Sequence, residues 1–186
     1  MTITSIPPVN QYIEPTCQRT AAPHGMPDMA ISTIWEAQTW ASQFDSVVTV
    51  FSPAHLADFG HHDHLRVDFC DRTNPKENAP KVEHIASVLS WAETRRDNSI
   101  LVHCKAGQSR SVATAIAILA SWGIHEIDAV KLAFWNYRPE SKLSERPFIP
   151  NKRVLEHADL LLGTDLMGAV VDLGFGYGGF NLWAEW

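Results

Sequence analysis

The sequence predicts an α/β protein built on a parallel β-sheet, and three observations lead to this fold class. Segments with the two-residue periodicity of strands alternate along the chain with segments of helical periodicity, which is the pattern of parallel α/β sheets. Residues 100–102 are all apolar, as expected for a strand that is covered on both faces. The length of 186 residues fits a single domain with one hydrophobic core.

The N-terminal part of the chain is predicted to be an irregular arm. Five prolines interrupt residues 1–28, and the apolar side chains there show no periodicity. The first regular elements are expected after this arm: a strand over residues 30–34, a half-buried helix over 36–42 and a strand over 46–51.

The central part of the chain continues the alternation of strands and helices. Apolar and polar side chains alternate over residues 65–69, which predicts a strand. A helix is then expected to begin with Asn78 as its N-cap and Pro80 in its first turn, and to end near residue 95. Its apolar side chains recur at helical spacing, so one face is expected to be buried. They are Val82, Ile85, Leu89 and Ala92.

Three helices are predicted after the apolar strand. Residues 109–122 carry no charge after Arg110, so this helix is expected to be central and buried. Two more helices are expected over residues 127–136 and 151–162, and a glycine follows both the first and the last of the three. Residues 29–163 thus form the predicted domain.

The last segment, residues 164–186, is predicted to be a tail rich in glycine and aromatic side chains. From Leu173 onward it carries no charge before Glu185. Exposed aromatic side chains in this number favour association, so the tail is expected either to pack on its own domain or to dock on a partner.

Composition excludes several classes of protein. A formal net charge of −6 argues against nucleic-acid binding, which needs basic stripes. The longest uncharged apolar stretch, residues 112–122, is too short for a membrane span, and no secretory leader is recognisable. Three widely spaced cysteines, Cys17, Cys70 and Cys104, do not suggest a disulfide framework. A cytoplasmic location is therefore expected.

The segment with the clearest chemistry lies between the apolar strand and the buried helix. We call residues 104–110 the Cys-x5-Arg loop. A loop in this position can direct backbone N–H groups and a helix N-terminus at an anion, for which a phosphate group is well suited. Gly107 allows the backbone to curl, and the planar fork of Arg110 can bind two phosphate oxygens.

The candidate nucleophile of this loop is Cys104. Helix N-termini and nearby cations favour the thiolate form of a cysteine, and a thiolate can attack phosphorus directly. Ser111 is expected to donate a hydrogen bond to the sulfur and so to help it leave in a second step. His103 is expected to orient the nucleophile or to stabilise its charge.

These residues resemble the signature loop of the protein tyrosine and dual-specificity phosphatase superfamily. Cys104 and Arg110 are flanked by His103 and Ser111, as in that family, and residues 69–75 resemble its general-acid loop. The similarity extends through residues 138–139, 147–151, 158–159 and 162–163, which resemble the C-terminal segment of small bacterial members.

The resemblance implies a twisted, mainly parallel sheet flanked by helices, with neither a metal nor an organic cofactor. It implies that the loop binds phosphate through the residues Lys105, Ala106, Gly107, Gln108, Ser109 and Arg110. It also implies a general acid. Asp71, after the predicted strand, fits the spacing of small members better than Asp68, which is expected to be solvated or hydrogen-bonded locally.

The implied substrates are phosphotyrosine in proteins, also phosphoserine and phosphothreonine, or a small phosphomonoester. The alternatives are a phosphoinositide or inositol phosphate phosphatase, and a phosphoprotein-binding module without turnover. Lys105 matches a position of lipid-phosphatase loops, whereas Gln108 replaces their second lysine. Arsenate reductases and sulfur transferases also use Cys-x5-Arg loops, but related arsenate reductases carry the loop near the N-terminus.

Two other features have alternative interpretations. Residues 61–64 are three histidines and Asp63, side chains of the types that bind zinc. Because the sequence has no second ligand cluster with recognisable spacing, a solvated polar loop is the preferred interpretation. Cys70 is interpreted as a small core residue, with a protective disulfide to Cys104, as in redox-regulated relatives, as the alternative.

Overall fold

The computed structural model of the chain describes residues 27–75, 77–135 and 148–177. The predicted N-terminal arm, apart from residues 27 and 28, lies outside the described residues, as does the end of the tail from residue 178. No helix in the described ranges is long and apolar enough to span a bilayer.

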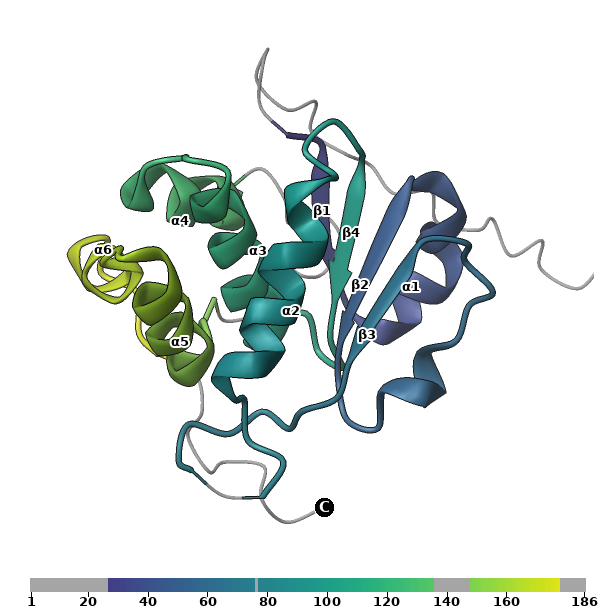
Figure 1. Cartoon of the computed structure of the whole chain (residues 1–186), viewed down its shortest axis with the longest axis horizontal. Coiled ribbons are helices and arrows are strands. Elements are labelled where there is room, and N and C mark those ends of the chain that lie inside the picture. The colour runs from purple at the N-terminus through teal and green to yellow at the C-terminus, as the bar shows by residue number, and fades with distance from the viewer. Residues whose placement is uncertain (1–26, 76, 136–147, 178–186) are drawn as a thin grey trace, which may run out of the picture.

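A four-stranded, all-parallel sheet forms the centre of the molecule (Figure 1), which confirms the predicted fold class. The sheet contains β1 (Met29–Ser32), β2 (Ser46–Val50), β3 (His64–Val67) and β4 (Ile100–His103), in the spatial order β1-β4-β2-β3. Strand β4, the all-apolar strand of the prediction, lies between two neighbours and is fully buried. The carboxyl ends of all strands therefore meet at one edge of the sheet.

Both faces of the sheet are covered by helices, and the alternation of side chains along the strands decides which face each residue joins. Ala30, Val47 and Leu101 pack against α1 (Ile34–Trp40) and the short 3-10 helix η1 (Ala41–Gln43). The other face, which includes Val48 and Val102, packs in the main core with the remaining helices. These are α2 (Val82–Glu93), α3 (Arg110–Ser121), α4 (Glu126–Trp135), α5 (Lys152–Leu162) and α6 (Leu166–Asp172).

Helix α3 is the central helix of this second layer, as the sequence predicts. Residues 110–120 are all buried, and the helix contacts α2, α4 and α5. A helix without charges after its first residue can be enclosed in this way without leaving ionised groups in the core. Its first residue, Arg110, is consequently held rigidly where the Cys-x5-Arg loop ends.

The predicted start of α2 at Asn78 is wrong. The helix begins at Val82, and Asn78 has a left-handed backbone with φ 61°. Its carbonyl accepts a hydrogen bond from the backbone N–H of Cys70 at 2.6 Å. Pro80 disfavours the helical conformation of the residue before it, so the chain stays non-helical until after the proline. This bond joins Cys70, which follows β3, to the segment that leads into α2.

The described part of the predicted tail contains α6, a helix that the sequence interpretation did not include. Asp165 caps it, accepting from the N–H of Gly168, and the carboxylate of Asp159 accepts from the N–H groups of Leu166 and Met167. After the helix, Phe175 packs against the rings of Phe134 and Phe148. This segment joins the main core through α4 and α5.

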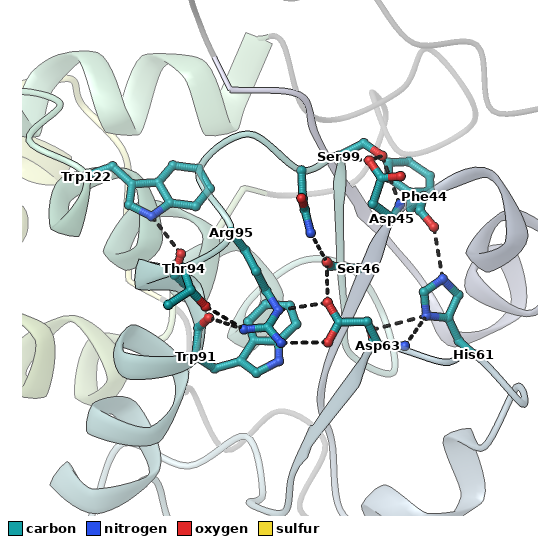
Figure 2. Close-up of polar contacts among 12 residues, drawn as sticks. Phe44, Asp45, Ser46, His61, Asp63, Trp91, Thr94, Arg95, Ser99 and Trp122 are labelled. Carbon is teal, nitrogen blue, oxygen red and sulfur yellow. Dashed lines mark hydrogen bonds and ion pairs between the residues drawn. The ribbon is translucent and has the colours of Figure 1, made fainter.

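The amino edge of the sheet is held by an ion pair between Asp63 and Arg95 (Figure 2). Two N–H groups of the guanidinium donate to the two oxygens of Asp63, at 2.7 and 2.8 Å, and Ser46 donates to the same carboxylate at 2.6 Å. The guanidinium also lies 4.3 Å from the ring centroid of Trp91. This clamp joins the starts of β2 and β3 to the end of α2, at the edge opposite the Cys-x5-Arg loop.

The histidines between residues 61 and 64 have separate partners and do not form one solvated loop. His61 contacts the backbone carbonyl of Phe44 at 2.9 Å and lies beside Asp63, whereas His62 is exposed and stacks on the ring of His61. His64 points to Thr49 inside the sheet layer. Among the described residues, no group of three or more His, Cys, Asp or Glu side chains could hold a metal ion.

Candidate active site

The Cys-x5-Arg loop lies at the carboxyl edge of the sheet, between the end of β4 and the start of α3. Neighbouring segments donate hydrogen bonds to its outward-facing carbonyl groups: Ile34 to Lys105 at 3.3 Å, Ile149 to Gln108 at 3.3 Å, and Asn151 to Ser109 at 3.2 Å. A trans peptide unit holds its N–H opposite its C=O, so the N–H groups of these units face away from the anchoring segments. The loop is thus shaped to present N–H donors on its inner side.

Gly107 allows this curved backbone to lie against the end of β1. It has φ 67°, which is unfavourable for residues with a side chain. A Cβ atom at this position would lie 2.9 Å from the carbonyl carbon of Ser32 and 3.1 Å from the amide nitrogen of Thr33. Both the conformation and the contact therefore require glycine here.

The thiol of Cys104 lies at the bottom of the loop and is almost fully buried, with 1% of the residue exposed. Its Sγ lies 3.2 Å from the Oγ of Ser111, in the first turn of α3, and accepts the N–H of Gly107 at 3.2 Å. The two predicted partners, Cys104 and Ser111, are therefore in contact.

Arg110, the last residue of the loop, is also buried, with 6% of the residue exposed. Its Nη1 donates to the carbonyl of Phe69 at 2.9 Å, and its guanidinium carbon lies 5.8 Å from the ring centroid of Phe51. Its Nε is buried and has no hydrogen-bond partner among the described residues. A buried donor without a partner costs about 1–3 kcal/mol, which an anion bound at this position would offset.

Asp71 is the carboxylate that the fold brings to the loop. Its Oδ1 accepts hydrogen bonds from Ser109 Oγ at 2.8 Å and from Asn151 Nδ2 at 2.6 Å. Its Oδ2 lies 3.9 Å from Nε of Arg110, and 38% of the side chain is exposed. Both of these hydrogen bonds go to Oδ1, whereas the contact with Arg110 goes to Oδ2.

Asp68, the competing candidate, has a different environment. It lies one residue after β3, is exposed, and its Oδ2 accepts the backbone N–H of Ala54 at 3.1 Å. The carboxylate thus ties the β3 end to η2 (Ala54–Ala57), a segment that follows β2. The sequence interpretation expects Asp68 to be solvated or hydrogen-bonded locally; the side chain is exposed, and its hydrogen bond goes to a residue 14 positions away.

Asn151 is a further residue of this site, and the sequence interpretation assigned it no role. It is fully buried. Its Oδ1 caps α5 by accepting the N–H of Val154 at 3.1 Å, and its Nδ2 donates to Asp71. An asparagine before a helix is a recognisable N-cap signal. This local signal does not predict the partner of Nδ2, because Asp71 is distant in the sequence.

The remaining predicted residues line or support the loop. Lys105 and Ala106 are exposed and Gln108 is partly exposed, so their side chains lie at the mouth of the site. His103 is fully buried, and its ring contacts Thr49 and the backbone carbonyl of Cys104, not the sulfur. Cys70 is a free, partly buried cysteine.

No family model matches the sequence, and no curated protein matches it either. Among solved structures, the chain is similar to one described as the crystal structure of Tk-PTP in the active form. The two are 22% identical, the match covers 73% of this chain and 90% of the other, and the TM-score is 0.46. The chemistry of the site is therefore derived from the contacts of this chain alone.

Proposed function

We propose that this protein is a cysteine-dependent phosphoric monoester hydrolase. The observation that carries the proposal is the meeting of Cys104, Arg110 and Asp71 at one loop. The loop holds a buried thiol with two hydrogen-bond partners and a buried guanidinium, whose Nε has an ion-pair contact of 3.9 Å with Asp71 but no hydrogen-bond partner among the described residues. A phosphoryl group has the oxygen acceptors for that donor and for the loop N–H groups, and it presents phosphorus to the sulfur.

The first chemical step would be the attack of the Cys104 thiolate on phosphorus. A sulfur–phosphorus bond forms while the bond from phosphorus to the ester oxygen breaks, and Asp71 gives its proton to that oxygen. Arg110 and the N–H groups of the loop stabilise the charge on the other phosphoryl oxygens. The products of this step are the free alcohol or phenol and a cysteinyl-phosphate.

The second step would return the enzyme to its starting state. The carboxylate of Asp71 takes a proton from a water molecule, whose oxygen attacks phosphorus, and the sulfur–phosphorus bond breaks. Ser111 Oγ, 3.2 Å from the sulfur, donates a hydrogen bond to the departing thiolate. Inorganic phosphate then leaves.

The substrate class that we propose is phosphotyrosine in proteins, with phosphoserine and phosphothreonine as further substrates. Of the loop residues at its mouth, Lys105 is the one lysine, and Gln108 stands where lipid-phosphatase loops have a second lysine. Phosphoinositides and inositol phosphates are highly charged and favour several cations around the phosphate, so they fit this mouth less well. A cytoplasmic location also belongs to the proposal, because the free thiol needs a reducing compartment.

The test of the proposal is hydrolysis of p-nitrophenyl phosphate and of a phosphotyrosine peptide by the wild-type chain and two cysteine variants. Cys104→Ser is expected to lower kcat/KM on the order of 10⁴-fold or more, because a serine hydroxyl is not ionised by this environment. Cys70→Ser is the matched control and is expected to retain activity. Acid-quenched wild-type enzyme should carry one phosphoryl group on the peptide that contains Cys104.

Two outcomes would contradict the proposal in different ways. Tight binding of the phosphopeptide by the wild-type chain without any turnover would favour a phosphoprotein-binding module. A panel in which a phosphoinositide or an inositol phosphate is hydrolysed much faster than phosphotyrosine and phosphoserine peptides would keep the mechanism but replace the substrate class.

A further inference from the structure

A chain of hydrogen bonds leads from β3 through the buried sheet to the Cys-x5-Arg loop. The Oγ1 of Thr49 lies 2.6 Å from Nε2 of His103 and 2.7 Å from Nε2 of His64. Thr49 and His103 are both fully buried and are paired neighbours on β2 and β4. The ring of Phe59 stacks on His64 and lies 5.3 Å from that of His103, so the chain has an aromatic cover.

The contact between His103 and the Cys-x5-Arg loop determines which ring nitrogen of His103 carries a proton. Nδ1 of His103 lies 3.5 Å from the backbone carbonyl oxygen of Cys104. A carbonyl only accepts, so Nδ1 must carry the proton in this contact. Burial lowers the pKa of His103 to about 3, so the ring is neutral near pH 7 and has only this one proton. Its Nε2 is therefore an acceptor and receives the hydroxyl proton of Thr49.

The protonated nitrogen of His64, at the other end of these hydrogen bonds, follows from the same proton count. A hydroxyl group has one proton, so the Oγ1 of Thr49, which donates to His103, must accept from His64. His64 is thus protonated at Nε2, and burial, its largest influence, lowers its pKa to about 4 and keeps it neutral. Its Nδ1 is then a bare nitrogen, and this atom is buried without a partner among the described residues. The charged or titratable groups that act on the pKa of His64 besides burial are Arg66, His61, Asp58 and Asp63.

The carbonyl of Cys104 belongs to the first peptide unit of the loop. The carbonyls of Lys105, Gln108 and Ser109 receive backbone N–H groups from neighbouring segments. His103 supplies the corresponding donor to the first unit. If the ring of His103 were rotated by half a turn about its Cβ–Cγ bond, a carbon atom instead of Nδ1–H would face the carbonyl of Cys104. The hydrogen bond between Thr49 and Nε2 selects the orientation in which Nδ1–H faces this carbonyl.

We propose that Thr49 and His64 are positioning residues that act on the Cys-x5-Arg loop through the ring of His103. They fix the orientation in which Nδ1–H is held against the carbonyl of Cys104, and this aligns the peptide unit that carries the nucleophile. The inference rests on the proposed function for its catalytic consequence, but the chain of hydrogen bonds does not depend on turnover.

The test that needs no variant is the tautomeric state of the two rings. A long-range ¹H–¹⁵N correlation spectrum of the full chain at pH 7 should show His103 as the Nδ1–H tautomer and His64 as the Nε2–H tautomer. If either ring has the opposite tautomer, the proposed direction of the hydrogen bonds from His64 through Thr49 to His103 is overturned. This measurement is independent of phosphatase activity.

The functional test compares two substitutions of Thr49 with one of Thr114. Thr49→Val removes the hydroxyl and keeps the shape, whereas Thr49→Ser keeps the hydroxyl. Thr114→Val is the matched control, because this threonine is also buried and its Oγ1 has no hydrogen-bond partner among the described residues. The readouts are the alkylation rate of Cys104 by iodoacetate at pH 6.5, followed by mass spectrometry of its peptide, and kcat on p-nitrophenyl phosphate.

Thr49→Val is expected to lower both rates on the order of tenfold, because a misaligned loop no longer directs its donors at the sulfur and at the incoming anion. Thr49→Ser should restore both to within about twofold, and Thr114→Val should change neither. An alkylation rate in folded Thr49→Val that equals or exceeds that of wild type would overturn the proposal. Absence of turnover in the wild-type enzyme, with the alkylation differences intact, would contradict only the proposed function.

Discussion

Nδ2 of Asn151 donates a hydrogen bond to Oδ1 of Asp71 at 2.6 Å, although the two residues are 80 positions apart in the sequence. The same side chain caps α5 with its Oδ1, so one buried amide joins the start of a helix to the candidate general acid. Ser109 donates to the same carboxylate oxygen. Together these two donors hold the carboxylate beside the loop and turn its other oxygen toward Arg110.

The first prediction concerns Asn151. Asn151→Ser keeps a side-chain oxygen for the helix cap but lacks the longer side chain whose Nδ2 reaches Asp71, whereas Asn151→Ala loses both groups. Both variants are expected to lower kcat/KM for a phosphotyrosine peptide by about tenfold, because the acid is no longer held in place. Only Asn151→Ala should also lose about 1 kcal/mol of unfolding free energy through the missing cap. Urea unfolding and steady-state kinetics on the two proteins separate the roles. Full activity in Asn151→Ser would show that the bond to Asp71 is not needed.

The second prediction distinguishes Asp71 from Asp68. A general acid matters most when the leaving oxygen binds a proton tightly, so Asp71→Asn should slow phosphotyrosine hydrolysis by about 10²–10⁴-fold and affect an acidic aryl leaving group far less. Asp68→Asn is the control, because its carboxylate contacts only the edge of η2 among the described hydrogen bonds. A plot of log kcat/KM against leaving-group pKa, for wild type and both variants, is the measurement. A steeper slope in Asp68→Asn than in Asp71→Asn would assign the role to the other aspartate.

The third prediction compares two glycines with the same φ of 67°. Alanine at Gly60 would meet no atom within 4 Å, whereas at Gly107 its Cβ would lie 2.9 Å from the backbone of Ser32. Gly60→Ala should therefore cost only the backbone strain, about 1–2 kcal/mol. Gly107→Ala should cost more and should also abolish activity, since the loop must move away from β1. Thermal unfolding and turnover of the two variants test this. Equal stability losses, with activity retained in Gly107→Ala, would contradict the close contact.

The fourth prediction is a loss of stability on acidification that begins near neutral pH. Burial lowers the pKa values of His64 and His103 from 6.5 to about 4 and about 3. Below pH 6.5 the unfolded chain binds protons at these histidines that the folded chain does not. The unfolding free energy should thus fall as the pH falls, by up to about 1.4 kcal/mol per pH unit for each histidine.

Urea unfolding between pH 7 and pH 4.5 measures this slope. The window lies above the range in which Asp63 takes up its proton, since the hydrogen bond from Arg95 lowers the pKa of that carboxyl below 3.8. His64→Phe should remove part of the slope, and His62→Gln, at an exposed position, should leave it unchanged. A slope in wild type no steeper than in His64→Phe would show that His64 takes up its proton equally in both states.

Several elements could be predicted closely from local sequence patterns. The apolar strand β4 and the uncharged helix α3 are where the hydrophobic pattern places them, because burial on all sides selects side chains without charge. The sequence pattern predicts the start of α2 too early, because Asn78 and Pro80 also fit a non-helical loop with a left-handed residue. It does not predict helix α6, since seven residues with a glycine inside them give a weak periodic signal.

The fold class and the residue order of the Cys-x5-Arg loop follow from local sequence patterns, because both depend on residues that are close together in the chain. Which carboxylate reaches the loop, that Asn151 and Ser109 contact it, and that Thr49 links His64 to His103 follow from the three-dimensional structure. The cause is the same for all three. These contacts join side chains from separate strands and loops, and their meeting depends on strand register and on the packing of α5 against the core.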